Sequence, residues 1–286
     1  MKLNHDPLAD RHVIDSIDRI LRDIDLAKIS SITNFNHDKS WRSWIMNTPY
    51  NHVQGLDSFV YSAFVPGTTD AFGEFIARYP TRRIRVSRND FVLTEILARS
   101  WNRTLLHLED ALLDQNDCVI ISLPFSGNGS YYQHWNDLLD QADLFEVPVF
   151  LDAAYFGISH GIDYPLHRSC IKDFAISLSK PLAGNQLRLG IRFTKDNVDD
   201  GVTAGLIGSD IFDRLNAWIS MQLLNEFSHA WIIDRYKPVS DTIVNQYNLV
   251  PTNTVTLALG NESMMQFKRG DYIRVVISDE ISRVFV

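Results

Sequence analysis

The sequence predicts an α/β protein with a mainly parallel sheet flanked by helices, and two observations support this. Short apolar runs typical of buried strands recur between residues 59 and 193. Segments with helical periodicity separate most of these runs, and strands that alternate with helices form parallel sheets buried on both faces. A shorter pattern of a helix and two strands follows from residue 238, so we expect a smaller α+β domain at the C-terminus.

The N-terminal 50 residues comprise two segments that differ in composition and periodicity. Apolar residues recur at close to helical period over the first 30 residues, which predicts a helix. Residues 34–53 are rich in Trp, Asn, His and Pro without a clear period. We predict an irregular surface segment there, either packed by its own aromatic side chains or closing over a pocket.

The next part of the chain supplies the elements of the predicted sheet. The expected strands span 59–65, 82–86, 118–125, 147–155, 173–179 and 188–193. The expected helices span 69–79, 91–101, 104–114 and 131–145. Ligands bind such sheets outside the carboxyl ends of the strands, so the chemistry should be found there.

The C-terminal part begins with one long helical pattern over 207–233. The elements expected after it are a helix near 238–247, strands near 253–259 and 272–278, and a turn at KRGD. We therefore predict three parts: an N-terminal helix and irregular segment, a large domain, and a long helix with a small domain. Their predicted boundaries are 1–50, 51–206 and 207–286.

Composition and charge exclude several classes of protein. The chain has 286 residues, with 27 Lys+Arg against 35 Asp+Glu, and its net charge of −8 disfavours binding to nucleic acid or to an anionic membrane. No apolar run approaches the ~20 residues of a membrane span, and no secretory signal is visible. Cys118 and Cys170 make neither a disulfide framework nor a metal-type spacing. We expect a soluble, cytoplasmic protein without a metal.

The first motif that suggests chemistry is VPGTTDAFGEF at 65–75. A strand ends, Gly67 permits a tight turn, and Thr68, Thr69 and Asp70 begin a helix. Backbone N–H groups and hydroxyls at a helix N-terminus form a site suited to phosphate. A plain helix-capping turn is the alternative.

The second motif is VFLDAAYFG at 149–157, in which Asp152 directly follows a buried strand. A buried carboxylate without a partner is costly, and a protonated ring nitrogen of a cofactor would supply one. A structural aspartate that caps the next helix is the alternative.

The third motif, SLSKPLAGNQLRLGIRF at 177–193, is the most specific. Lys180 lies at the end of a strand, where a lysine of lowered pKa can form a Schiff base. Ser177, Ser179 and Arg188 would bind a phosphate, the arginine through two parallel hydrogen bonds. A solvated loop at the strand end is the alternative.

Together these motifs resemble the class I/II aminotransferases, which are fold-type I enzymes that use pyridoxal 5'-phosphate (PLP). The shared order is G-T-T, an aromatic residue, a P-x-x-x-x-G turn, D-x-A-Y, S-x-S-K and R-x-G. The resemblance implies that Lys180 forms the Schiff base with PLP, that Asp152 pairs with the pyridine nitrogen and that Tyr155 bonds the ring hydroxyl. All three are therefore implied to be catalytic residues.

The resemblance also implies the phosphate ligands of the cofactor. Ser177 and Arg188 match the family's serine and arginine around the lysine, and the turn at Gly67 adds contacts from Thr68 and Thr69. The chain is shorter than the usual family member, so substrate specificity transfers less well than cofactor binding.

Two further roles follow from the resemblance. Phe91 is implied to stack on the cofactor ring, and Arg274 in the strand YIRVVIS is implied to bind the substrate α-carboxylate. The alternative for Arg274 is an ion pair with a nearby acid, Asp271 or Asp279.

The sequence departs from the family at the turn whose asparagine bonds the ring hydroxyl. The family's P-x-N-P-T-G is PFSGNG here, so either Ser126 or Asn128 occupies that place. Both are retained as candidate cofactor contacts.

The expected function is that of a PLP-dependent enzyme acting on an amino acid, with transamination as the leading reaction. Elimination, replacement, decarboxylation and racemisation on the same scaffold are the alternatives, and a protein that binds without turnover is another. The resemblance also implies a homodimer in which Tyr50 or Tyr61, from the aromatic stretch 41–61, lies near the partner's cofactor phosphate. For the individual aromatic residues of this stretch, packing in the core or an interface is the preferred interpretation.

Overall fold

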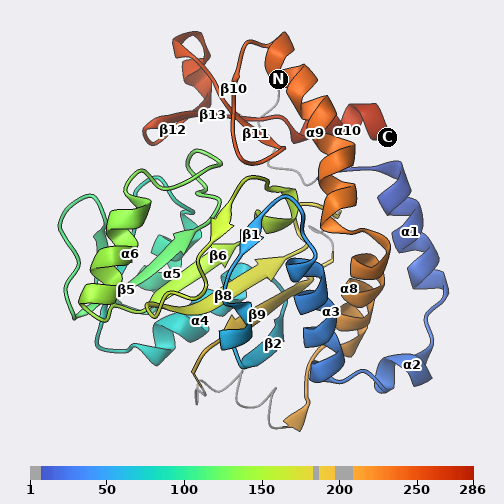
Figure 1. The fold of residues 1–286 in the computed structure, drawn as a ribbon, viewed down its shortest axis with the longest axis horizontal. Helices are drawn as coiled ribbons and strands as arrows, with labels where there is room; N and C mark the ends of the chain where they lie inside the picture. Colours follow the sequence, from blue (N-terminus) through green and yellow to red (C-terminus); the bar gives the residue numbers. More distant parts are fainter. Residues whose placement is uncertain (1–7, 183–186, 197–208) are drawn as a thin grey trace.

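A seven-stranded sheet forms the centre of the molecule in the computed structural model, which describes residues 8–182, 187–196 and 209–286 (Figure 1). Strand β9 is antiparallel to both of its neighbours, and the other pairs are parallel. The predicted, mainly parallel sheet is therefore confirmed. In spatial order the strands are β2 (Tyr61–Val65), β9 (Gly190–Thr194), β8 (Ile171–Ser177), β6 (Val149–Ala153), β5 (Asp117–Ser122), β3 (Arg83–Val86) and β4 (Leu105–His107).

Helices cover both faces of this sheet because alternate residues of each strand point to opposite sides. Ile120 and Phe150 face α4 and α5, and the ring of Phe72 in α4 lies 5.2 Å from that of Phe150. Ile121 and Leu151 belong to the core on the other face, which α3, α6 and α8 cover. These helices are α4 (Thr68–Arg78), α5 (Leu93–Ser100), α3 (Asn34–Met46), α6 (Trp135–Leu144) and α8 (Arg214–Glu226).

A second, four-stranded antiparallel sheet stands above the carboxyl ends of the large sheet in Figure 1. Gly270, with φ +58°, makes the tight KRGD turn between β12 and β13, as the sequence predicts. The elements of this C-terminal unit are β10 (Val250–Pro251), β11 (Leu257–Leu259), the 3-10 helix η3 (Glu262–Phe267), β12 (Lys268–Arg269), β13 (Tyr272–Val276) and α10 (Ser278–Phe285). The remaining short elements are β1 (His52–Val53), which pairs in parallel with β7 (Asp163–Tyr164), and the 3-10 helices η1 (Leu56–Ser58) and η2 (Phe156–Ile158).

The predicted N-terminal helix is two helices, α1 (Arg11–Arg22) and α2 (Leu26–Ser30). The side chain of Asp25 accepts hydrogen bonds from the backbone N–H groups of Ala27 and Lys28, so it starts a new helix instead of continuing the first. Apolar periodicity did not reveal this break. Residues 1–7 lie outside the described part of the chain.

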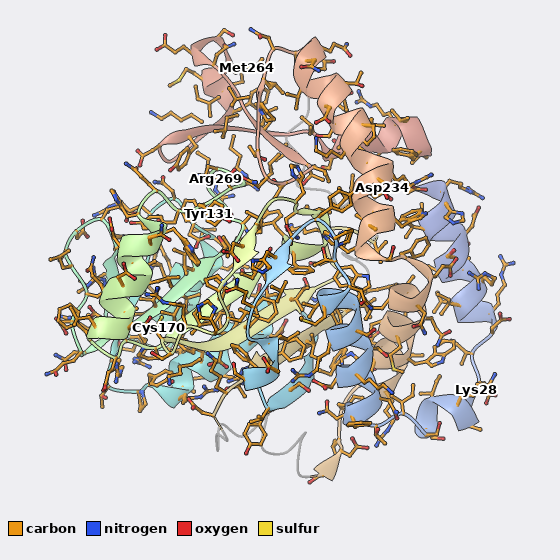
Figure 2. The ribbon with its side chains drawn as sticks, in the orientation of Figure 1. Lys28, Tyr131, Cys170, Asp234, Met264 and Arg269 are labelled. Atoms are coloured by element: carbon orange, nitrogen blue, oxygen red, sulfur yellow. The ribbon has the colours of Figure 1, made fainter. Side chains whose placement is uncertain are left out.

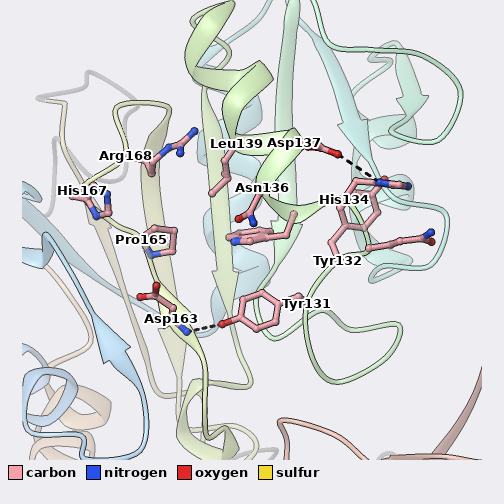
Figure 3. A pocket seen from close by; sticks show the side chains of 12 residues that line it. Tyr131, Tyr132, His134, Asn136, Asp137, Leu139, Asp163, Pro165, His167 and Arg168 are labelled. Atoms are coloured by element: carbon pink, nitrogen blue, oxygen red, sulfur yellow. Dashed lines mark hydrogen bonds and ion pairs between the residues drawn. The ribbon is translucent and has the colours of Figure 1, made fainter.

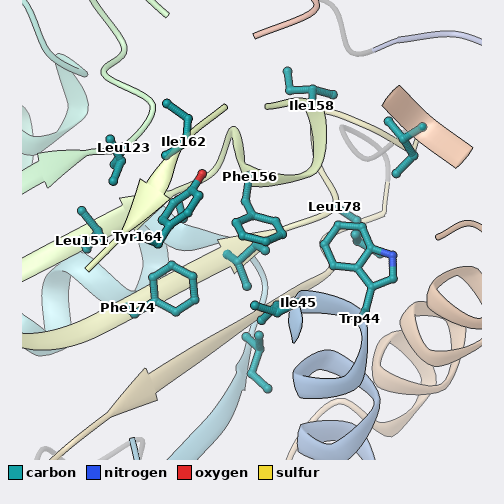
Figure 4. Close-up of a cluster of buried hydrophobic side chains, with 14 of the residues drawn as sticks. Trp44, Ile45, Leu123, Leu151, Phe156, Ile158, Ile162, Tyr164, Phe174 and Leu178 are labelled. Carbon is teal, nitrogen blue, oxygen red and sulfur yellow. The ribbon is translucent and has the colours of Figure 1, made fainter. Parts of the chain in front are cut away.

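The prediction of an irregular segment over residues 34–53 is wrong for most of its length, because Asn34–Met46 forms α3. Thr33 and Asn36 form a capping box that starts the helix. Trp41 and Trp44 are buried on its inner side, and Trp44 packs 5.7 Å from the ring of Phe156 (Figure 4). Bulky aromatic anchors, rather than a regular aliphatic stripe, make this helix part of the core. The core interpretation is thus confirmed for both tryptophans.

The helix predicted over 104–114 is also wrong. Leu105–His107 forms the edge strand β4, which pairs in parallel with β3, and turns follow it. Three residues are too short for periodicity to distinguish a strand from a helix, so pairing with β3 decides the conformation.

The single helix predicted over 207–233 is two helices, α8 and α9 (His229–Gln246). Ser228 caps α9 by accepting a hydrogen bond from the N–H of Trp231, which breaks the helical run after Glu226. Helix α9 continues through Pro238, so the separate helix expected near 238–247 is its second half. No helix within the three described ranges is both long and apolar enough to cross a membrane.

Candidate active site

A cavity of about 300 Å³ lies where β5, β6 and β8 end, on the side of the large sheet that the topology predicts for a ligand. It brings together most of the candidate residues from all three motifs. Asn128 and Arg274 are the candidates outside its lining. The lining residues are Gly67, Thr68, Thr69, Asp70, Phe91, Leu93, Ser122, Ser126, Asp152, Ala154, Tyr155, Ser177, Ser179, Lys180 and Arg188.

One end of the cavity is built for an anion. Helix α4 starts there at Gly67, and no side chain caps its first turn. The hydroxyls of Ser177 and Ser179 lie 2.8 Å apart, and the half-exposed guanidinium of Arg188 donates to Asp70 at 2.9 Å. A β-carbon at Gly67 would lie 2.7 Å from Nη2 of Arg188, so a larger residue there would push this side chain away. Backbone N–H groups, two hydroxyls and an arginine together suit a phosphate.

Asp152 lies on the floor of the cavity and is buried. Its carboxylate accepts hydrogen bonds from the hydroxyl of Thr68 and, at 3.0 Å, from the N–H of Ala154. Burial, with a further contribution from the charge of Asp90, raises the pKa of Asp152 to about 7. A cation beside this carboxylate would restore its ionised form.

Lys180 and Tyr155 face each other across the cavity. Nζ of Lys180 lies 5.6 Å from the centre of the Tyr155 ring, and it has no hydrogen-bond partner among the residues described. The phenol oxygen of Tyr155 accepts a hydrogen bond from Nη2 of Arg274 at 2.7 Å. This bond joins the C-terminal unit to the cavity.

Arg274 is buried, with 4% of its surface exposed, and makes no ion pair with any residue in the described part of the chain. Its Nε and Nη1 are buried and have no hydrogen-bond partner in the part of the chain that the structure describes. The alternative pairing with Asp271 is not formed, because that carboxylate accepts from Nδ2 of Asn89 at 2.8 Å. A buried guanidinium with two such nitrogens is suited to an anionic ligand.

The structure distinguishes Ser126 from Asn128, the two candidates in the turn PFSGNG that departs from the family pattern. Ser126 lines the cavity, and its N–H donates to Oγ of Ser122 at 2.8 Å. Asn128 instead holds its own turn together: its Nδ2 donates to the carbonyl of Tyr131, and its Oδ1 accepts from the N–H of Ser130. Geometry therefore favours Ser126 at this position.

Sequence reasoning missed two groups next to this turn. The carboxylate of Asp90 accepts from both the hydroxyl and the N–H of Ser122, and also from the N–H of Phe91. Burial raises the pKa of Asp90. Ser122 and Asp152 are partners in the pairing of β5 with β6, so the two carboxyls flank one floor of the cavity. The position of Asp90 directly before the stacking candidate Phe91 was the available signal.

A larger cavity of about 630 Å³ lies between α6 and the loop before β8 (Figure 3). Several of its polar groups already have partners within the protein. The hydroxyl of Tyr131 accepts from the N–H of Asp163 at 2.7 Å, and Arg168 pairs with Asp140 and Asp143. This cavity has neither the lysine nor the anion-binding turn, so the smaller one is the candidate active site.

The fold corresponds to a known class of structure, that of the aminotransferases. The N-succinyldiaminopimelate aminotransferase of Mycobacterium tuberculosis has a TM-score of 0.67 and 11% identity over 98% of this chain and 91% of that chain. The aspartate aminotransferase of Thermus thermophilus has a TM-score of 0.65 and 13% identity over 90% and 75%. The PLP-bound C-S lyase of Staphylococcus hominis has a TM-score of 0.65 and 10% identity over 97% and 88%.

No family model and no curated protein sequence matches the chain. The structural likeness, at these low identities, establishes the fold. The chain has the aminotransferase fold, and the fold predicted from the motifs is confirmed.

Proposed function

We propose that this protein is a PLP-dependent enzyme that acts on an amino acid, with transamination as the leading reaction. The observation that supports this most is the meeting of three motifs, far apart in sequence, in one cavity. The first turn of α4, the carboxyl of Asp152 and the amine of Lys180, which has no partner among the described residues, suit three different parts of one cofactor: its phosphate, its ring nitrogen and its aldehyde.

The residues present fit PLP on structural grounds. Its phosphate would be held by Ser177, Ser179, Arg188 and the first turn of α4. Its protonated ring nitrogen would place a cation beside the buried carboxyl of Asp152, where the charge of Lys180 already acts to lower the pKa. Its aldehyde carbon would react with Nζ of Lys180.

PLP, when bound, supplies an electron sink for a carbanion at the substrate Cα. The protein's own residues then select and move the proton. Lys180 serves as the general base and acid, since its amine has no competing partner among the described residues. Arg274 orients the substrate by its α-carboxylate, since its Nε and Nη1 have no hydrogen-bond partner among the described residues. The hydroxyl of Tyr155 accepts a hydrogen bond from Arg274 and would be left to donate one to the ring oxygen of the cofactor.

The contact of Ser126 is the weakest point of the resemblance. A serine hydroxyl is shorter than an asparagine amide, and its backbone is tied to Ser122. We therefore propose that control of the cofactor ring oxygen comes mainly from Tyr155. Phe91 lines the cavity and is proposed to stack on the ring.

The absorption spectrum of the purified protein tests the proposal directly. PLP should be taken up with a visible absorption band, and borohydride should fix it covalently to Lys180. Lys180→Ala should lose turnover and covalent attachment but still bind PLP through the phosphate ligands. Lys39→Ala, at an exposed position of α3, is the matched control. A protein that takes up no PLP would refute the proposed function.

A panel of amino acids distinguishes the reactions. Transamination leaves the cofactor in its aminated form and needs an acceptor keto acid, whereas elimination releases a keto acid and ammonia without one. Decarboxylation releases carbon dioxide, and racemisation changes only chirality. A protein that binds without turnover would change no substrate. The C-S lyase with this fold makes elimination the alternative to exclude first.

We also propose a homodimer that works in the cytoplasm. The apolar side chains of Phe35 and Val60 are 71% and 67% exposed beside Tyr61, which supports an interface at this edge of the sheet. Cys118 and Cys170 are buried free thiols, as in a reducing compartment. Tyr50 bonds Asp234, and neither Tyr50 nor Tyr61 lines the cavity of its own chain. Val60→Asp should lower the sedimenting mass of the dimer, and a fully active wild-type monomer would contradict it.

A further inference from the structure

One face of the small sheet is directed at the large domain and carries two arginines. Strand alternation places Tyr272 and Arg274 of β13 on the same face. Arg269 of β12 is paired in register with Tyr272, so its side chain belongs to that face as well. Lys268 is paired with Ile273 and belongs to the opposite face.

All three side chains of this face reach the large domain. The ring of Tyr272 lies 6.4 Å from that of Phe125, and Arg274 donates to the hydroxyl of Tyr155. Nη2 of Arg269 donates to the carbonyl oxygen of Asp90 at 3.3 Å. Figure 2 shows Arg269 where the C-terminal unit meets the large domain. Arg269 is not itself a lining residue, but it bonds the residue directly before the lining residue Phe91, which places it next to the cavity.

The two guanidinium groups are diagonal neighbours on paired strands, a separation of roughly 7–8 Å between backbone positions. Like charges so placed repel each other unless an anion lies between them. Among the described residues, neither arginine forms an ion pair with a carboxylate. Burial and the charge of Arg274 lower the pKa of Arg269, while the nearby Tyr155 and Asp90 act in the opposite direction.

The acids around this pair are already engaged. The carboxylate of Asp90 is held by Ser122 and Phe91, and that of Asp271 is bonded to Asn89. Once Arg274 binds the α-carboxylate of a substrate, Arg269 remains a partly buried cation with no carboxylate partner in the described ranges. This position next to the cavity is therefore suited to a second negative charge on the same ligand.

We propose that Arg269 determines substrate specificity, selecting amino acids that carry a second anionic group on the side chain. This inference rests on the proposed function, since it assigns the α-carboxylate to Arg274. The second group is a carboxylate or a phosphate, both of which match a guanidinium fork. The experiment below separates these two.

Binding of unreactive ligands tests the proposal without turnover. Succinate and its monoamide, succinamate, differ only in the charge at one end. Isothermal titration should show that wild-type protein binds succinate roughly 10- to 100-fold more tightly, because one charge-assisted hydrogen bond is worth that much. Arg269→Gln should remove this preference, and Arg269→Lys should retain part of it. Lys268→Gln should leave it unchanged, since Lys268 has the same charge in the same hairpin but belongs to the other face.

Turnover then identifies the anion. PLP-loaded enzyme is given aspartate, glutamate and O-phosphoserine, each beside its neutral counterpart asparagine, glutamine or serine. A preference for the acidic member of at least one pair, lost in Arg269→Gln, supports the proposal. Equal binding of succinate and succinamate by the wild type would overturn it, whatever the variants do. An equal loss in Lys268→Gln and Arg269→Gln would also overturn it. PLP uptake, measured separately, shows whether the proposed function itself has failed.

Discussion

Asp152 gives the sharpest test of the site, because the structure predicts that it destabilises the protein when no cofactor is present. Its pKa is raised from 3.8 to about 7, chiefly by burial. The folded protein therefore binds this proton more tightly than the unfolded chain. The stability that the Asp152 carboxyl contributes is present in full below about pH 4 and is lost as the pH rises through 7. Asp152→Asn cannot ionise, so it escapes this loss.

The magnitude follows from the shift in pKa. Each unit corresponds to about 1.4 kcal/mol, so the ionised carboxyl costs roughly 4 kcal/mol of unfolding free energy above pH 7. The advantage of Asp152→Asn over the wild type should grow by about 1.4 kcal/mol per pH unit between pH 4 and pH 7. It should then level off. A fixed offset from the changed hydrogen bonds of Thr68 and Ala154 does not alter that slope.

Urea unfolding of cofactor-free protein at several pH values measures this difference. The wild type, Asp152→Asn and the exposed control Asp57→Asn are compared with and without PLP. PLP should stabilise the wild type more than Asp152→Asn, because its ring nitrogen pairs with the carboxylate. A difference that does not change with pH would refute the reasoning, since Asp152 would then ionise as readily in the folded protein as in the unfolded chain.

Three further predictions concern the anion site and the core. Gly67→Ala should leave the fold intact but weaken PLP binding about ten-fold, because the new methyl group displaces Arg188; equilibrium dialysis measures it. Burial lowers the pKa of His37 to about 3, so the wild type should lose up to about 1.4 kcal/mol per pH unit on acidification below 6.5. Acid titration of His37→Gln should lack that contribution. Trp41→Ala should cost about 3–5 kcal/mol in urea unfolding, since this side chain is wholly buried, and a cost below 1 kcal/mol would contradict its place in the core.

Local sequence was sufficient for the residues of the cavity that follow strands. Asp152, Ser177 and Lys180 each stand at or just after the end of an apolar run. In a parallel sheet the carboxyl ends of all strands meet at one edge, so residues at those ends converge. Spacing then placed Arg188 close to Ser177, because β9 runs back beside β8.

Contacts between distant segments were not predictable in the same way. Arg274 reaches Tyr155 across 119 positions of sequence, and Arg269 reaches Asp90 across 179. No local pattern records which face of a short hairpin will meet the large sheet. Asp90 was missed because a single acid in a loop has no periodicity.

The sequence by itself determined the class of fold, the candidate site residues that follow the ends of the strands and the lysine around which the site is built. These depend on patterns a few residues long. Only the tertiary structure decided that residues 34–46 are a core helix, where aromatic anchors rather than a regular apolar stripe provide the burial. Only it placed Ser126, and not Asn128, in the cavity, because a turn's direction depends on hydrogen bonds to Ser122 and Tyr131. Burial, which is a property of the folded chain, likewise decided the charge state of Asp152.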